Sequence, residues 1–170
     1  IGTKWPGFEE AFRGFDPRVL SALEDHEVSA LEQDTRIVRN AGKIRAVLDN
    51  AGFITDIAAT HGSFGRWVAD WPGDDITGLW AVLKDSGARL GGDTGPRMLR
   101  KMGKDTFILS NDVVAALVAL GVVTKKPTSK ADLRAVQAAF NQWRTESGRE
   151  LGAISITLAC TVASPTPADL

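Results

Sequence analysis

Apolar residues recur every three or four positions between Arg39 and Ala59, and this spacing constrains the fold more than any other feature of the chain. The positions concerned are Ile44, Val47, Leu48, Ala51, Ile54 and Ile57. Side chains at this spacing lie on one face of an α-helix, so the pattern predicts one long amphipathic helix that ends at His61 and Gly62. Such a face is buried against other elements, which is typical of packed helical folds.

Helix starts recur along the rest of the chain, whereas patterns typical of strands are almost missing. Residues that cap helices precede several apolar segments, namely Asp16, Ser63, Ser110, and Thr128 or Ser129. We therefore predict a compact all-α fold of about eight helices over residues 1–162. The tail, residues 163–170, carries two prolines and no apolar pattern, and we predict that it is disordered.

The overall charge of the chain excludes a general affinity for polyanions. The 170 residues carry a net charge of −1, so any contact with nucleic acid must come from local basic patches. Cys160 is the only cysteine, which excludes an internal disulfide and any metal site built from several cysteines. No apolar run could span a membrane and no signal peptide is visible, so we expect a cytoplasmic protein. Because the chain begins at Ile1 and not with Met, we also expect that an N-terminal segment is absent.

A glycine-rich turn at residues 87–95 lies between two predicted helices, and basic residues follow it at once. The turn contains Gly91, Gly92, Thr94 and Gly95, and the basic residues are Arg97, Arg100, Lys101 and Lys104. Glycines let backbone N–H groups approach a phosphate closely, and the start of the next helix adds partial positive charge. We therefore predict that this hairpin binds a nucleic-acid backbone. The alternative is an ordinary helix–helix turn followed by a solvated basic helix face.

A second basic group stands at the start of the long helix. It consists of Arg36, Arg39, Asn40 and Lys43. Positive side chains at a helix start oppose the helix dipole, and a nearby phosphate or acid would offset that small cost. DNA contact, for which Arg39 and Lys43 are the candidates, and an internal salt bridge explain this group equally well.

Asp112 lies just after the hairpin and its basic residues, in the first turn of the helix that Ser110 begins. An acid at this position is stabilised by the helix dipole, which explains it without any function. An acid beside a nucleic-acid binding site could also take part in a reaction of the bound nucleic acid.

Four blocks of the sequence resemble the DNA-3-methyladenine glycosylase I family, within the helix-hairpin-helix DNA glycosylase superfamily. They are FEEAFRGFDP (8–17), RIVRNAGKIRAVLDNA (36–51), RLGGDTGPRMLRKMGKDTFILSNDVV (89–114) and TSKADLRAVQAAFNQWRTESG (128–148). The resemblance covers nearly the whole chain except the tail. The hairpin alone is a weak signal, and the ordered combination of the four blocks makes the resemblance specific.

The resemblance implies a bacterial base-excision repair enzyme that binds double-stranded DNA. Such an enzyme flips out an alkylated purine, most plausibly 3-methyladenine, and hydrolyses its N-glycosidic bond. Asp112 matches the superfamily's aspartate, which stabilises the cationic sugar in the transition state. No lysine stands beside Asp112 at the position of the Schiff-base residue of lyase-type members, so a monofunctional glycosylase is implied. No cofactor is implied, and we expect a monomer.

Three departures from the family pattern leave alternatives open. The family begins several dozen residues earlier, and that part holds an acidic residue that contacts the flipped base. Well-known members bind structural zinc through Cys and His, whereas Cys160 has no His near it in sequence, so no metal site is predicted. The hairpin has Leu90, Gly91 and Gly92 in place of Leu-Pro-Gly. The alternatives are a non-catalytic helix-hairpin-helix DNA-binding module and an interaction domain that has lost DNA binding.

Overall fold

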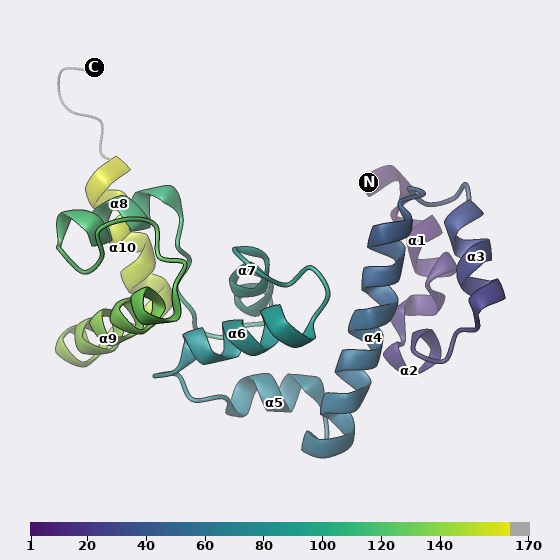
Figure 1. The fold of residues 1–170 in the computed structure, drawn as a ribbon, viewed down its shortest axis with the longest axis horizontal. Helices are drawn as coiled ribbons and strands as arrows, with labels where there is room; N and C mark the ends of the chain where they lie inside the picture. The colour runs from purple at the N-terminus through teal and green to yellow at the C-terminus, as the bar shows by residue number, and fades with distance from the viewer. Residues whose placement is uncertain (164–170) are drawn as a thin grey trace. The chain divides into compact units, whose positions relative to one another are not determined.

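The computed structural model describes residues 1–163, and within these residues every regular element is a helix (Figure 1). Two short 3-10 helices accompany ten α-helices. In chain order the elements are η1 (Gly2–Lys4), α1 (Trp5–Ala11), η2 (Arg13–Phe15), α2 (Pro17–Leu20), α3 (Asp25–Gln33), α4 (Ala41–His61), α5 (Phe64–Asp70), α6 (Ile76–Ser86), α7 (Thr94–Lys101), α8 (Asn111–Ala119), α9 (Lys130–Ser147) and α10 (Leu151–Ala163). The all-α prediction is confirmed, and residues 164–170 of the predicted tail lie outside the described residues.

The two α-helices beyond the predicted eight are α1 and α3. Pro6 lies in the first turn of α1, where the missing backbone N–H removes no helical hydrogen bond. A capping box of Glu24 and Glu27 begins α3, with the Glu27 carboxylate accepting a hydrogen bond from the Glu24 backbone N–H at 3.0 Å. Ser, Thr, Asp and Asn are the residues that usually cap helix starts, so a glutamate at the cap position of α3 is a weaker signal in the sequence.

Contacts between the elements divide the chain into two units. Unit 1 contains residues 1–69 and 84–89, and unit 2 contains residues 70–83 and 90–170. Helix α6 is divided between them, because residues 84–86 are its last three. The extent of the predicted domain, residues 1–162, stays a prediction.

Helix α4 is the central element of unit 1, with α1, α2 and α3 gathered along one side of it in Figure 1. The core of the unit is made of Ala11, Phe12, Leu20, Leu31, Ile37, Ile44 and Ala51. The apolar face predicted for α4 is therefore confirmed at Ile44 and Ala51. Gly62 ends the helix with a φ of +82°, a conformation that glycine adopts without strain.

Helices α8 and α9 pack against α10 in unit 2. The segment from Thr106 to Leu109, which leads from α7 to α8, is buried. Within it, the Phe107 ring stacks on Phe140 of α9 with ring centroids 4.1 Å apart. Trp80 of α6 lies edge-on to the Phe107 ring, with centroids 4.7 Å apart. Aromatic packing therefore joins α6 and α9 to this extended segment.

Hydrogen bonds from α10 hold the same segment in place. The Asp105 carboxylate accepts hydrogen bonds from the backbone N–H groups of Leu151 and Gly152, each at 2.8 Å, and so caps the start of α10. The Ser155 hydroxyl accepts from the Ile108 N–H at 3.1 Å and donates to the Ile108 carbonyl at 3.2 Å. These bonds fix the chain that leads into α8.

A side chain from α9 holds the start of α6 in a similar way. Gln137 is buried, and its Oε1 accepts a hydrogen bond from the Thr77 backbone N–H at 3.0 Å. Its Nε2 donates to Oδ1 of Asn141 at 2.8 Å, and Nδ2 of Asn141 donates to the Asp74 carbonyl at 2.8 Å. Two amide side chains of α9 therefore bond to the first turn of α6 and to the loop before it.

Candidate nucleic-acid interface

The turn between α6 and α7 uses its glycines for two different reasons. Gly92 has a φ of +59° and open space around it, so its role is to supply a left-handed backbone conformation. Gly95 is buried in the first turn of α7, and a Cβ there would lie 2.7 Å from the Leu90 carbonyl oxygen. Any other residue at 95 would force the loop away from the helix. Thr94 is exposed, and its N–H donates to the Gly91 carbonyl at 3.3 Å.

The four basic residues that follow the turn fall into two pairs. Arg97 and Lys101 are exposed and one helical turn apart on α7, and neither side chain has a partner among the described residues. Arg100 is half-buried and donates to the Thr106 carbonyl at 2.9 Å. Lys104 is half-buried and donates to the Trp71 carbonyl at 2.5 Å, and burial lowers its pKa. Only the first pair is free to meet a ligand without breaking an internal contact.

Asp112 lies in the first turn of α8, as the sequence predicted. The Ser110 side chain caps the helix by accepting a hydrogen bond from the Val113 N–H at 3.3 Å. The Asp112 side chain is exposed, and within residues 1–163 no hydrogen bond or ion pair engages its carboxylate. The carboxylate is therefore available, and no neighbouring side chain fixes its orientation.

The basic group at the start of α4 contains one arginine in an internal ion pair and two exposed cations, so the internal salt bridge is confirmed for Arg36 and DNA contact stays a prediction. Arg36 forms an internal ion pair with Asp34 at 2.7 Å and with Glu10 at 2.6 Å. The hydrogen bonds between Arg36 and Asp34 raise the pKa of the guanidinium and lower that of the carboxyl. Arg39 and Lys43 are exposed, and the described part of the chain offers no partner to either side chain.

Asn40 caps α4, because its side chain accepts a hydrogen bond from the Lys43 backbone N–H at 3.0 Å. Arg89, from the far end of unit 1 in sequence, lies against the same turn. Its Nη2 is 3.0 Å from the place where a Cβ on Gly42 would stand. Sequence reasoning missed Arg89, because helical periodicity carries no information about a contact between segments so far apart.

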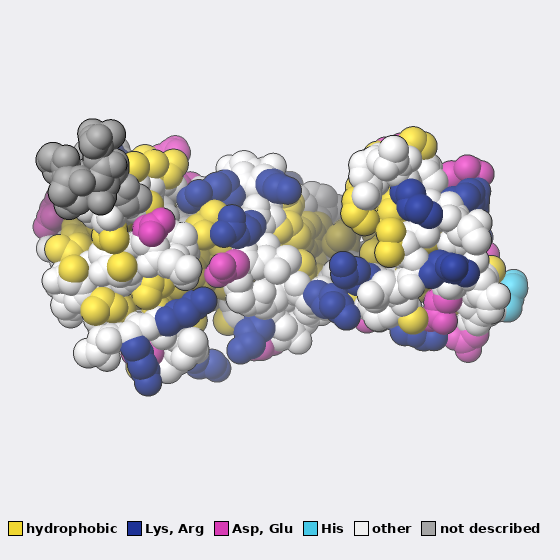
Figure 2. Space-filling view, turned by 90° about the horizontal axis from the view of Figure 1, so that it is seen from above, with side chains coloured by type: hydrophobic (Ala, Val, Ile, Leu, Met, Phe, Trp, Pro, Cys, Tyr) yellow, Lys and Arg dark blue, Asp and Glu magenta, His cyan; other side chains and the backbone are white. Residues whose placement is uncertain are grey.

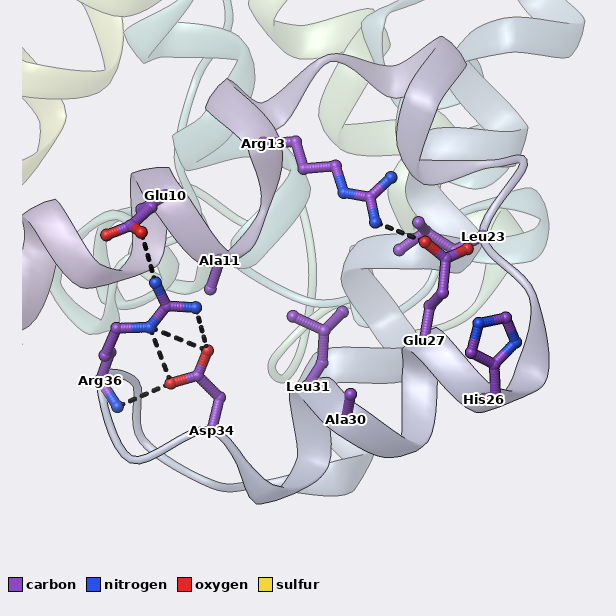
Figure 3. A pocket seen from close by; sticks show the side chains of 10 residues that line it. All are labelled: Glu10, Ala11, Arg13, Leu23, His26, Glu27, Ala30, Leu31, Asp34 and Arg36. Carbon is purple, nitrogen blue, oxygen red and sulfur yellow. Dashed lines mark hydrogen bonds and ion pairs between the residues drawn. The ribbon is translucent and has the colours of Figure 1, made fainter.

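Unit 1 also contains a pocket of about 320 Å³ between α1 and α3 (Figure 3). Arg13 reaches across it to Glu27, and Arg36 reaches to Asp34 and Glu10. None of the predicted site residues lines this pocket. Its charged groups are paired with one another, so it is a polar cleft within the fold and not part of the predicted interface.

Basic side chains are exposed at several places on the face drawn in Figure 2.

Within residues 1–163, no helix combines the length and the hydropathy that crossing a bilayer requires. Among the same residues, no three His, Cys, Asp or Glu side chains come together in a way that could hold a metal ion.

Comparison with known proteins gives a local match to a curated protein and a longer match to a family model. DNA-3-methyladenine glycosylase 1 of Escherichia coli (strain K12) is 38% identical over 48 residues, which is 28% of this chain and 26% of that protein. The matched segment therefore spans about a quarter of the relative's length. No solved structure matches the chain significantly. The family model described as methyladenine glycosylase matches residues 1–129, which include the start of α4, the hairpin and Asp112. The chain belongs to the methyladenine glycosylase family.

Proposed function

We propose that the protein is a DNA glycosylase that removes alkylated purines, most plausibly 3-methyladenine, from double-stranded DNA. One observation carries the proposal: the family match over residues 1–129 contains a glycine-dependent hairpin followed by two exposed cations without partners. The proposed reaction is hydrolysis of the bond between the base and the deoxyribose C1′ after the nucleotide has been flipped out of the duplex.

The hairpin is the proposed grip on the DNA backbone. Backbone N–H groups of the turn around Gly92 and at the start of α7 would face a phosphate, since Gly92 is exposed. Arg97 and Lys101 add charge on the adjacent helix face. Arg100 and Lys104 contribute indirectly in this proposal, because their hydrogen bonds to backbone carbonyls hold the hairpin helix and the loop that follows it.

Asp112 is the proposed catalytic carboxylate. As the glycosidic bond breaks, positive charge develops on the sugar, and a carboxylate beneath the ring stabilises it and can orient the attacking water. Water adds to C1′, the base leaves with the bonding electrons, and the surplus proton passes to solvent. A purine alkylated at N3 is already cationic and becomes neutral on departure, so it needs no general acid. Without a neighbouring lysine to form a Schiff base, the expected product is an abasic site in an uncut strand.

The test is base release from methylated duplex by the full-length protein, with abasic sites as the readout. Asp112→Asn is expected to reduce turnover by about two to three orders of magnitude, since it removes electrostatic stabilisation of the transition state, while DNA binding is retained. Asp132→Asn is the matched control, because Asp132 also lies in the first turn of a helix that a serine caps. Folded wild-type protein that binds duplex but releases no base would reject the glycosylase function.

A second candidate is a DNA-binding module without catalysis. One observation favours it: the Asp112 carboxylate has no hydrogen-bond partner among residues 1–163 that would orient it toward a sugar. This candidate predicts salt-dependent binding to duplex and no product, and it predicts equal behaviour of the Asp112→Asn protein and the wild type.

A further inference from the structure

The Lys and Arg side chains of unit 1 differ in whether they interact with other groups of the chain. Six of the ten are engaged within the chain: Lys4, Arg13, Arg18, Arg36, Arg45 and Arg66. The other four, Arg39, Lys43, Lys84 and Arg89, are exposed and have no partner among the described residues. Three of these four belong to the start of α4 or lie against it. The free positive charge of unit 1 is therefore concentrated at one place.

The charge at this place is opposite to the charge in the first turns of α3, α8 and α9. Acids stand in the first turns of α3, α8 and α9, where their negative charge interacts favourably with the positive end of the helix dipole. The first turn of α4 has no acid, although α4 is the longest helix, with 21 residues. Lys43 is in that turn and Arg39 just precedes it. The local cost of this arrangement is removed when an anion binds between the cations.

The fold also brings Arg89 to the same turn from a distant segment. Asn50 of α4 accepts a hydrogen bond from the Ala88 N–H at 2.8 Å and donates to the Ala88 carbonyl at 3.0 Å. Both backbone groups of residue 88 are thereby tied to α4, directly before Arg89. The Arg89 guanidinium then occupies the space that a side chain on Gly42 would fill. Gly42 is helical and needs no left-handed φ, so its lack of a side chain serves this close approach.

We infer that Arg39, Lys43 and Arg89 form a second contact with the DNA phosphate backbone, which we call the α4 cationic surface. This inference rests on the proposed function, since it assumes that the protein binds DNA. Guanidinium groups bind phosphate oxygens in a bidentate manner, and an ammonium group adds a compact charge. The α4 cationic surface lies wholly in unit 1, whereas the hairpin from Leu90 onward belongs to unit 2. Each unit thus carries its own contact with the backbone.

The salt dependence of duplex binding tests this inference with the full chain. Each phosphate contact contributes about 0.9 to the slope of log K against log salt concentration. The triple variant Arg39→Gln, Lys43→Gln, Arg89→Gln is expected to lower the slope by about 2 to 3 and to weaken binding most at low salt. Lys84→Gln, which removes a free cation of the same unit outside the cluster, is the matched control and should leave the slope near the wild-type value.

Substitutions of Gly42 separate binding from folding. Gly42→Asp places a carboxylate beside Arg89 and in the first turn of α4, where an acid favours the helix dipole. We expect this variant to melt at a higher temperature than Gly42→Ala and to bind duplex at least tenfold more weakly at low salt. Gly42→Ala adds the same Cβ without charge, so the difference between the two variants isolates the carboxylate. A loss of binding caused by unfolding would lower the melting temperature as well.

The outcomes distinguish this inference from the proposed function. Arg97→Gln combined with Lys101→Gln tests the hairpin in the same titrations. If the hairpin variant loses slope and the α4 triple variant keeps the wild-type slope and affinity, the inference is overturned and the proposed function stands. If the wild-type protein does not bind duplex at all, both are overturned. A reduced slope in the triple variant, with normal folding and an unchanged Lys84→Gln control, supports the α4 cationic surface.

Discussion

Unit 1 and unit 2 stabilise their polar groups in different ways. In unit 1 the ion pairs have at least one partner whose side chain is about half exposed or more, as Arg36 is in its pair with Asp34 and Arg45 in its pair with Glu32. In unit 2, Asp105 reaches from a loop to the start of α10 and Gln137 reaches from α9 to the start of α6, contacts of the kind that Asn50 makes with Ala88 in unit 1. Water can replace an exposed ion pair, whereas a less accessible backbone N–H that loses its partner stays unsatisfied. We therefore expect these backbone contacts of unit 2 to be more sensitive to single substitutions than the ion pairs of unit 1.

The largest effect is expected at Asp105. Asp105→Ala removes two charge-assisted hydrogen bonds from the start of α10, and we expect a loss of about 3 kcal/mol in the free energy of unfolding. Asp105→Asn keeps one acceptor and should lose about half as much. Urea unfolding measures both values. Hydrogen exchange should accelerate first at the Leu151 and Gly152 amides, and a loss below 1 kcal/mol for Asp105→Ala would contradict the expected difference between the units.

A somewhat smaller effect is expected at Gln137. Gln137→Leu fills a similar volume but leaves the Thr77 N–H without its acceptor, so we expect a loss of about 2 kcal/mol. Gln142→Leu on the same helix is the control, because the Gln142 side chain is exposed and donates to Glu146 nearby on α9. Thermal melting of the two proteins should differ by several degrees, with Gln142→Leu close to the wild type.

The two glycines of the hairpin give a comparison within unit 2. Gly95→Ala forces a Cβ against the Leu90 carbonyl, and we expect a loss of about 2 kcal/mol in stability together with weaker duplex binding. The Cβ of Gly92→Ala meets open space, so only the positive φ is unfavourable, and we expect a loss of about 1 kcal/mol in stability. Chemical unfolding of both variants checks the order, and equal losses would show that the close approach at Gly95 is not what requires glycine.

The smallest effect is expected from an ion pair of unit 1. Arg36 lowers the pKa of the Asp34 carboxyl, so their pairing stabilises the folded protein fully above the ordinary aspartate pKa of 3.8. This contribution is lost as the pH falls through the lower pKa of the folded state. Arg36→Gln should therefore unfold almost like the wild type at low salt near pH 2 and be slightly less stable at pH 6. Urea titrations at the two pH values measure the difference, and 1 M salt should reduce it.

The sequence predicted those features of the fold that are encoded locally. Periodic apolar residues and capping side chains identified α4, α8 and α9, because burial and capping act within one helix. The ends of these helices at Gly62, Gly121 and Gly148 follow from the need for a positive φ. Helix α1 was missed because Pro6 and Gly7 resemble residues that end helices, and Gly7 is explained by the close approach of the Arg36 carbonyl. That contact is tertiary and leaves no local pattern.

The sequence predicted the proposed site only at the level of residue type and order. The hairpin glycines were predicted from their position between two helices, Arg97 and Lys101 from the basic segment that follows, and Asp112 from the first turn of the next helix. The sequence could not show that Arg100 and Lys104 bond to carbonyl groups, since those partners depend on how the loop after α7 folds back. Nor could it show that Arg36 is paired while Arg39 is free. These distinctions depend on which acids the folded chain brings near each cation.

The bond between Asn50 and Ala88 has a consequence for how the protein is made. It joins residues 38 apart in sequence, so unit 1 depends on a contact between segments that are far apart in the chain. During synthesis, the N-terminal helices can form early, but Arg89 cannot reach Gly42 until residues 84–89 have left the ribosome. By then much of the chain between them, including α5, has already emerged. The N-terminal helices therefore exist on the ribosome for a time without their complete set of free cations, and a nascent chain paused before residue 89 would lack the third charge beside α4.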